Sequence, residues 1–284
     1  MNKSKRWEEF IKYRIPDGAD FRTQDGNKVW EIEPVFAICK KDSNNRWHFV
    51  ATAFFINRNG LFATAKHVIT EEDRKTITPG LNGFWFPNNR ECIIRPVVQL
   101  NLHEKADIAV GILAPVYKKD SKEPLTNKSM TLTLALPKIK TICSTFAYPK
   151  TTVDSSEQAQ SVHLRTSWLF GRVEEYYPDG ADKIFLTGKG FRTSHVVPFG
   201  ASGGPVADYK GKVFGINSAG LNLPTSEEPI SFISSIHDLL ECKLHKIQLG
   251  TSGDIREEIT VEELVQNRLI TLHNYDTRKK VKKK

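Results

Sequence analysis

The sequence predicts an all-β protein, and three observations support that fold class. From about Pro34 to Ile236 the chain consists mainly of short runs rich in β-branched and aromatic residues, which favour strands. Polar residues typical of turns separate these runs. Helical periodicity is confined to the two ends of the chain. Many short strands at regular spacing are typical of an antiparallel sandwich or barrel.

The predicted strands fall into two series. The first series comprises residues 34–41, 46–57, 60–65, 91–100 and 107–113. A polar stretch at residues 117–130 then interrupts the pattern, and it predicts a connection between two halves of the chain. The second series comprises residues 140–149, 161–177, 183–188, 204–208, 212–219 and 230–236.

Two extensions flank these strands, and each contains a predicted short helix. In the N-terminal extension, residues 1–33, three apolar side chains recur at the spacing of one helix face. They are Trp7, Phe10 and Ile11. In the C-terminal extension, residues 251–284, a capping box predicts a helix start because Glu263 follows Thr260 by three positions.

The composition is that of a soluble globular protein, with 39% hydrophobic and 26% charged residues. The formal net charge of +8 comes mostly from residues 278–284, which hold six basic side chains and no acid. Removing six from the 41 basic residues leaves 35 against 33 acidic ones, a net charge of +2. We expect this tail either to make weak, nonspecific contact with polyanions or to be a solvated end.

Cysteine usage and hydropathy point to the cytoplasm. No apolar run approaches the roughly 20 residues that span a bilayer, and residues 1–14 lack the apolar core of a secretory signal. Two disulfides would be conceivable in a secreted protein, but we expect free thiols and no membrane contact. The four cysteines concerned are Cys39, Cys92, Cys143 and Cys242. Neither they nor the histidines show metal-ligand spacing, so we expect no metal and no cofactor.

The stretch VVPFGASGGP, residues 196–205, sets a single serine, Ser202, between two small residues. A serine hydroxyl becomes a useful nucleophile when a base removes its proton and the developing oxyanion is stabilised. Glycine permits sharp turns and close approach, so the amides of Gly200 and Ser202 are candidates for an oxyanion hole. If this stretch is considered alone, a glycine-rich hairpin turn would explain the same residues.

Two further residues favour a catalytic interpretation. His67, in TAKHV, follows a hydrophobic strand, and Asp107, in KADIAV, begins another. A carboxylate beside a buried strand is costly unless it is hydrogen-bonded, and an imidazole N–H is a natural partner. The occurrence of His67, Asp107 and Ser202 in this order makes purely structural roles for all three hard to sustain.

The segments TAKHV, DIAV, GASGGPV and GKVFGINSAG together resemble the motifs of the chymotrypsin/trypsin-like serine peptidases, especially the bacterial HtrA-type branch. The resemblance covers residues 35–236, most of the chain. It implies a peptidase domain at residues 34–250. Within it we expect two antiparallel six-stranded β-barrels, at about residues 34–116 and 131–236, with the active site between them.

The resemblance also assigns roles. Ser202 is expected to be the nucleophile, His67 the general base and then acid, and Asp107 the carboxylate that orients the imidazole. The amides of Gly200 and Ser202 are expected to form the oxyanion hole. Substrate backbone is expected to pair along a segment of three residues. They are Ser218, Ala219 and Gly220.

Three departures from the family pattern modify these expectations. Ala201 replaces the aspartate that pairs with a freed N-terminus in the digestive enzymes, so we expect no activation by N-terminal trimming. Val196 falls at the base of the primary specificity pocket, and an apolar base favours small or hydrophobic residues before the scissile bond. The residues after Ile236 are too few for the PDZ domain that HtrA enzymes add, so none is expected here.

The sequence therefore predicts an intracellular serine endopeptidase that acts on protein or peptide substrates. Such an enzyme must be restrained, so we also expect a regulatory protein partner or signal. The alternative is a catalytically silent module that uses the peptidase fold for binding or sensing, because fold and residues alone do not guarantee geometry.

Overall fold

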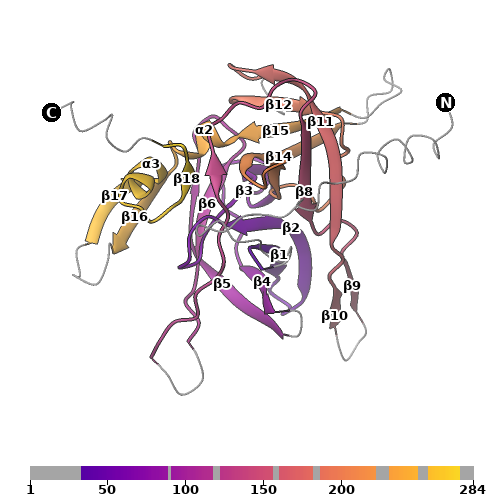
Figure 1. The fold of residues 1–284 in the computed structure, drawn as a ribbon. Helices are drawn as coiled ribbons and strands as arrows, with labels where there is room; N and C mark the ends of the chain where they lie inside the picture. Colours follow the sequence, from indigo (N-terminus) through magenta and orange to yellow (C-terminus); the bar gives the residue numbers. More distant parts are fainter. Residues whose placement is uncertain are drawn as a thin grey trace.

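The computed structural model describes residues 33–88, 91–117, 122–155, 160–181, 186–221, 230–248 and 255–275. Two β-barrels lie one above the other in Figure 1, the first drawn in indigo to magenta and the second in darker red to orange. The predicted N-terminal helix and the basic tail lie outside the described residues.

The first barrel is a closed ring of six antiparallel strands in the order β1-β2-β3-β6-β5-β4. The strands are β1 (Val35–Lys41), β2 (Trp47–Phe55), β3 (Leu61–Thr64), β4 (Leu81–Asn88), β5 (Glu91–Leu102) and β6 (Ala109–Leu113). Aromatic side chains fill its interior: the ring centroid of Phe36 lies 4.7 Å from that of Phe55 and 5.3 Å from that of Phe62. Both pairs adopt the tilted or edge-to-face geometry that aromatic rings favour.

The second barrel is also a ring of six antiparallel strands, in the order β13-β8-β11-β12-β15-β14, closed by pairing of β13 with β14. The strands are β8 (Ile142–Ala147), β11 (Ser167–Tyr177), β12 (Gly190–Thr193), β13 (Pro205–Asp208), β14 (Val213–Leu221) and β15 (Ile230–Ser235). Two short parallel strands, β7 (Leu132–Thr133) and β18 (Leu272–His273), extend the sheet beside β14. The predicted pair of six-stranded barrels is confirmed.

Smaller elements surround the barrels. A hairpin of β9 (Thr152–Ser155) and β10 (Gln160–His163) projects beside β2, and a second hairpin joins β16 (Lys243–Gln248) to β17 (Ile255–Thr260). The helices of the described residues are η1 (Lys66–Val68), α2 (Ile236–Leu239) and α3 (Val261–Gln266). The capping box predicted at the start of α3 is confirmed.

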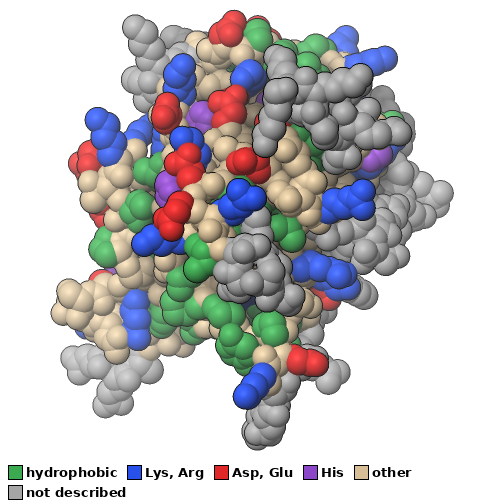
Figure 2. Space-filling view, turned by 90° about the vertical axis from the view of Figure 1, so that its left-hand side faces the viewer, with side chains coloured by type: hydrophobic (Ala, Val, Ile, Leu, Met, Phe, Trp, Pro, Cys, Tyr) green, Lys and Arg blue, Asp and Glu red, His purple; other side chains and the backbone are tan. Residues whose placement is uncertain are grey.

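β16 and β17 lie on opposite sides of the predicted domain boundary at residues 250 and 251, and they pair with each other. The domain limits stay predictions. Figure 2 views the face on which this hairpin lies in Figure 1. Acidic and basic side chains are interspersed over the upper part of this face, and hydrophobic side chains gather below them. None of the helices in the described ranges is long and apolar enough to cross a membrane.

Several strands differ from the sequence-based assignment. The strands that were not predicted are β4, β7, β9, β12, β16, β17 and β18. The predicted strand at 161–177 divides into β10 and β11. β4 escapes detection because it contains turn-forming residues, including Gly83. A Cβ atom at Gly83 would lie 2.7 Å from Leu113 and 2.9 Å from Phe36, so the crowded barrel interior requires glycine there. Within the predicted strand 183–188, the described residues 186–188 form a loop that leads into β12.

We predict that Phe62→Ala destabilises the protein by about 3–5 kcal/mol, because Phe62 is completely buried in the first barrel. Urea unfolding followed by fluorescence measures this change. Val98→Ala is the matched control, since Val98 on β5 is 61% exposed and its loss is expected to cost less than about 0.5 kcal/mol. Equal losses for the two variants would contradict the assignment of the core.

Candidate active site

The predicted site residues come from both barrels. His67 lies on η1, directly after β3, and Asp107 lies just before β6, so both belong to the first barrel. Ser202 lies in the loop before β13 of the second barrel. His67 and Ser202 line one cleft of about 670 Å³. Its other lining residues are Lys40, Asp42, His48, Phe49, Val50, Val68, Thr78, Phe199 and Gly200.

His67 and Asp107 are joined by two hydrogen bonds. The ring Nδ1 of His67 lies 2.7 Å from Oδ2 of Asp107, and the His67 backbone N–H donates to Oδ1 over 2.9 Å. The hydroxyl of Ser218 also donates to Oδ2. With Nδ1 held by the carboxylate, Nε2 is the ring nitrogen left to accept a proton.

The carboxyl group of Asp107 is buried yet remains ionised. Burial by itself raises its pKa, but the hydrogen bonds and charge of His67, together with the Ser218 hydroxyl, outweigh burial and lower the pKa to about 2. The sequence did predict the partnership with His67. For Ser218 it predicted backbone pairing with a substrate, and this role stays a prediction. The side chain of Ser218 is completely buried against Asp107, a contact that the sequence did not predict.

The loop that carries Ser202 requires glycine at two positions. Gly200 and Gly203 have φ values of +87° and +84°, in the left-handed region. A Cβ atom at Gly200 would lie 2.5 Å from the ring of Phe49, and one at Gly203 would collide with Thr64. The small residues around Ser202 therefore allow the loop of the second barrel to press against the first.

Thr52 of β2 fixes this loop across the boundary between the barrels. Its hydroxyl donates to the carbonyl of Gly200 over 2.7 Å and accepts from the Tyr148 N–H over 3.1 Å. Its backbone N–H donates to the carbonyl of Ser202 over 3.1 Å. Thr52 was not predicted as a site residue, because a buried threonine on a strand carries no sequence signal of such a role.

The amide of Ser202 is oriented by the peptide group to which it belongs. The carbonyl of Ala201 accepts hydrogen bonds from the Gly204 N–H and from Nδ2 of Asn217, each over 3.1 Å. Since the peptide bond is planar and trans, the Ser202 N–H points the opposite way. Within the described residues, neither this N–H nor that of Gly200 has a hydrogen-bond acceptor. Both are therefore available to a ligand.

The predicted substrate-binding residues differ in their surroundings. Ala219 and Gly220 pair with β15 on one side. On the other side, no strand of the described residues pairs with these two positions, because the β13 ladder ends at Ile216. An extended peptide has room to pair there, and this role stays a prediction.

Val196 is 45% exposed and lies outside the cleft, so its place at the base of a pocket also stays a prediction.

His195 is a buried structural residue. Its Nε2 lies 3.2 Å from Oδ1 of Asn217, and its Nδ1 lies 3.9 Å from the sulfur of Cys143. Burial lowers the pKa of His195 to about 4 and outweighs the hydrogen bond that the ring donates to Oδ1 of Asn217, so the ring is neutral. No group of three or more His, Cys, Asp and Glu side chains in the described part of the chain could hold a metal ion.

Comparisons with known proteins found one family profile and several solved structures that this chain resembles. The sequence profile of the trypsin-like peptidase domain matches residues 51–216. The HtrA-type protease AlgW bound to a tripeptide shares 17% identity over 72% of this chain, with a TM-score of 0.49, and this chain spans 57% of its length. The active form of the Rv3671c protease from M. tuberculosis shares 14% identity over 74% of this chain and 78% of its own, with a TM-score of 0.50. No curated protein sequence matches.

Two closed barrels with a Ser, His and Asp set at their junction define a chymotrypsin-like serine peptidase fold. The profile match covers more than half of the chain. The chain belongs to the trypsin-like peptidase family, the family that its sequence motifs predicted.

We predict that Asp107→Asn lowers kcat by about 10⁴-fold, the loss seen when the triad carboxylate of a chymotrypsin-like protease is changed in this way. The asparagine amide would hold the wrong tautomer of His67, so Nε2 would carry a proton and could not act as a base. Steady-state hydrolysis of a peptide substrate measures the change. Retention of most of the wild-type rate would mean that another carboxylate orients His67.

Proposed function

We propose that this protein is a serine endopeptidase that cleaves peptide bonds through Ser202, His67 and Asp107. One observation carries the proposal: the Asp107-bound imidazole of His67 lines the same cleft as Ser202 and Gly200, whose amides are available to an oxyanion. Acyl transfer by a serine requires a hydroxyl placed at the substrate, a base that takes its proton, and hydrogen-bond donors for the oxyanion.

In the proposed mechanism, Oγ of Ser202 attacks the carbonyl carbon of the scissile bond, and Nε2 of His67 takes the hydroxyl proton of Ser202. The carbonyl oxygen becomes an oxyanion, which accepts hydrogen bonds from the amides of Gly200 and Ser202. Asp107 stabilises the imidazolium that forms. His67 then protonates the leaving amine, and the C–N bond breaks to give an acyl-enzyme. Water, deprotonated by His67, hydrolyses the ester and restores Ser202.

The alternative is a catalytically silent binding or sensing module, and the nucleophile loop argues against it. A silent member of a peptidase family needs a distorted oxyanion loop or a missing group. Here the carbonyls of Gly200, Ala201 and Ser202 are each held by a hydrogen bond from a buried partner. Because Asn217 holds Ala201 from within the second barrel, we propose that the enzyme needs no N-terminal cleavage for activity.

For specificity, we propose small or hydrophobic residues before the scissile bond. Val196, Val197, Pro198 and Phe199 precede the oxyanion loop, and none carries a charge. The exposed face of Val196 would be covered by a substrate side chain seated on it. A lysine or arginine there would lose water without gaining a counter-charge from these residues.

For location and partners, we propose a cytoplasmic enzyme that acts on proteins or peptides under the control of a protein partner or signal. All four cysteines are free thiols, which suits a reducing compartment. Burial raises the pKa of Cys39, Cys143 and Cys242 to about 12, so these thiols are also unreactive. We further propose weak contact of the basic tail, residues 278–284, with polyanions.

The central test is Ser202→Ala. We expect this variant to lose both peptide hydrolysis and labelling by a fluorophosphonate probe while its thermal unfolding stays close to that of the wild type, because only one oxygen is removed. Ser231→Ala provides a serine control outside the cleft, since its hydroxyl accepts from the Val197 N–H. Labelling that survives in Ser202→Ala would place the nucleophile elsewhere, and a wild type without labelling would support the silent module.

The specificity proposal predicts that peptides with Ala, Val, Leu or an aromatic residue before the scissile bond exceed those with Lys or Arg in kcat/KM by at least about 100-fold. Val196→Asp is expected to raise cleavage after basic residues relative to apolar ones. Profiling of both proteins on one peptide library measures the ratio. A wild-type preference for Lys or Arg would show that an acidic group from elsewhere reaches the pocket.

A further inference from the structure

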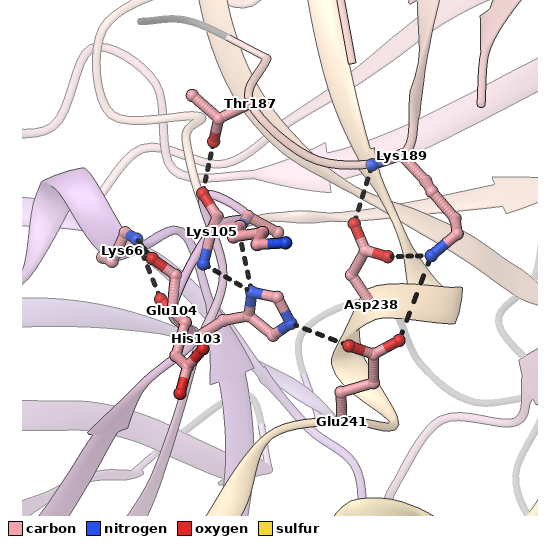
Figure 3. Close-up of polar contacts among 9 residues, drawn as sticks. Lys66, His103, Glu104, Lys105, Thr187, Lys189, Asp238 and Glu241 are labelled. Carbon is pink, nitrogen blue, oxygen red and sulfur yellow. Dashed lines mark hydrogen bonds and ion pairs between the residues drawn. The ribbon is translucent and has the colours of Figure 1, made fainter. Parts of the chain in front are cut away.

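A buried histidine outside the triad controls the turn that presents Asp107. His103 follows the end of β5, four residues before Asp107, and its side chain is 9% exposed. Its Nδ1 accepts the Ala106 N–H over 2.8 Å and the Lys105 N–H over 3.1 Å. The backbone N–H of His103 donates to the carbonyl of Ile108 over 2.9 Å. Figure 3 shows the ring inside the turn that it closes.

This turn is also held from three neighbouring elements. Nζ of Lys66, the residue before His67, donates to the His103 carbonyl over 2.9 Å. The hydroxyl of Thr187, from the loop before β12 of the second barrel, donates to the Lys105 carbonyl. Glu241, just after α2, lies with Oε2 3.6 Å from Nε2 of His103. Both barrels and the segment after α2 therefore fix the backbone next to the catalytic carboxylate (Figure 3).

The hydrogen bonds define the state of the His103 ring. Since Nδ1 accepts two backbone N–H groups, it carries no proton, and the single ring proton lies on Nε2, facing Glu241. A second proton on Nδ1 would oppose two N–H donors and end both bonds. The charged groups around the ring come from every element packed against it. They are Lys66, Glu104, Lys105, Lys189, Asp238 and Glu241.

None of these charged groups can replace Nδ1 of His103 as the acceptor for the amides of Lys105 and Ala106. Asp238 is committed to Lys189, with its two oxygens 2.7 Å from the backbone nitrogen and 3.0 Å from Nζ. Glu241 faces the opposite ring nitrogen, so it can attract a charged ring but cannot accept from the turn. The two amides before Asp107 therefore depend on the neutral ring of His103.

We propose that His103 is a positioning residue for Asp107: its imidazole closes the turn that aligns the carboxylate with His67, and loss of the Nδ1 acceptor opens the turn and misaligns the triad. This inference rests on the proposed peptidase function. The effect on rate follows from geometry, because a displacement of about 1 Å in a catalytic group costs up to about 100-fold.

The test compares two substitutions of His103. In His103→Asn, the side-chain oxygen can accept from the same two amides but cannot titrate, whereas His103→Ala has no acceptor. We expect His103→Ala to lower kcat by about 10- to 100-fold with little change in KM, and His103→Asn to keep kcat near the wild-type value. His163→Ala is the matched control, because His163 is an exposed histidine that pairs with Asp154 over 3.1 Å outside any such turn.

Rescue by asparagine is the readout that a merely structural role would not change, because this substitution restores only the acceptor for the two amides. Unchanged kcat in His103→Ala would overturn the proposal. An equal loss of kcat in His103→Asn and His103→Ala would overturn it as well.

A measurement without turnover separates this proposal from the proposed function. The proton between His67 Nδ1 and Asp107 gives a far-downfield NMR signal when that bond is formed. We expect the signal at neutral pH in the wild type and in His103→Asn, and its loss or broadening in a folded His103→Ala. If His103→Ala does not fold, His103→Asn decides, because a folded His103→Asn without the signal would overturn the proposal. A wild type that shows the signal but cleaves no peptide would contradict the peptidase function alone.

Discussion

The candidate active site depends on one contact between the barrels, that of Thr52 with the loop that carries Ser202. His67 belongs to the first barrel and Ser202 to the second, so a small rotation of one barrel would separate them. Thr52 prevents this by binding the carbonyls of Gly200 and Ser202 while it also accepts from Tyr148. A serine peptidase built on two barrels needs such a joint, because neither barrel alone contains a complete site.

The polar groups buried around this joint serve orientation more than stability. Removing a charge such as that of Asp107 from water costs several kcal/mol, which its hydrogen bonds have to offset. The structure meets this requirement with three donors to the carboxylate, two from His67 and one from Ser218. His195 and Asn217 form a second buried set beneath the Ser202 loop, and Asn217 bonds to the backbone on both sides of Ser202. The hydrogen bonds around Asp107 and those around Asn217 each hold the surrounding side chains and backbone in one arrangement.

Sequence reasoning found the residues whose chemistry is distinctive and missed those whose role depends on where the chain passes. Ser202, His67 and Asp107 stand in local patterns, and alternating β-branched and aromatic residues indicated most strands. β4 was missed because Gly83 breaks the propensity pattern, although the same residue is required by the crowded interior. Thr52 gave no signal, because its partners lie in loops whose positions emerge only when the barrels close. His103 gave none, because a histidine that accepts from amides two and three residues on has no distinctive sequence pattern.

The parallel pairing of β18 with β7 covers the edge of the sheet that extends from the second barrel. β7 lies between β14 and β18, and the N–H of Leu132 donates to the carbonyl of Thr271. A chain that is still being synthesised, or that is cut before Leu272, leaves this edge of the sheet open. Open edges invite pairing with other chains, so the segment that follows α3 protects the peptidase fold from association at β7.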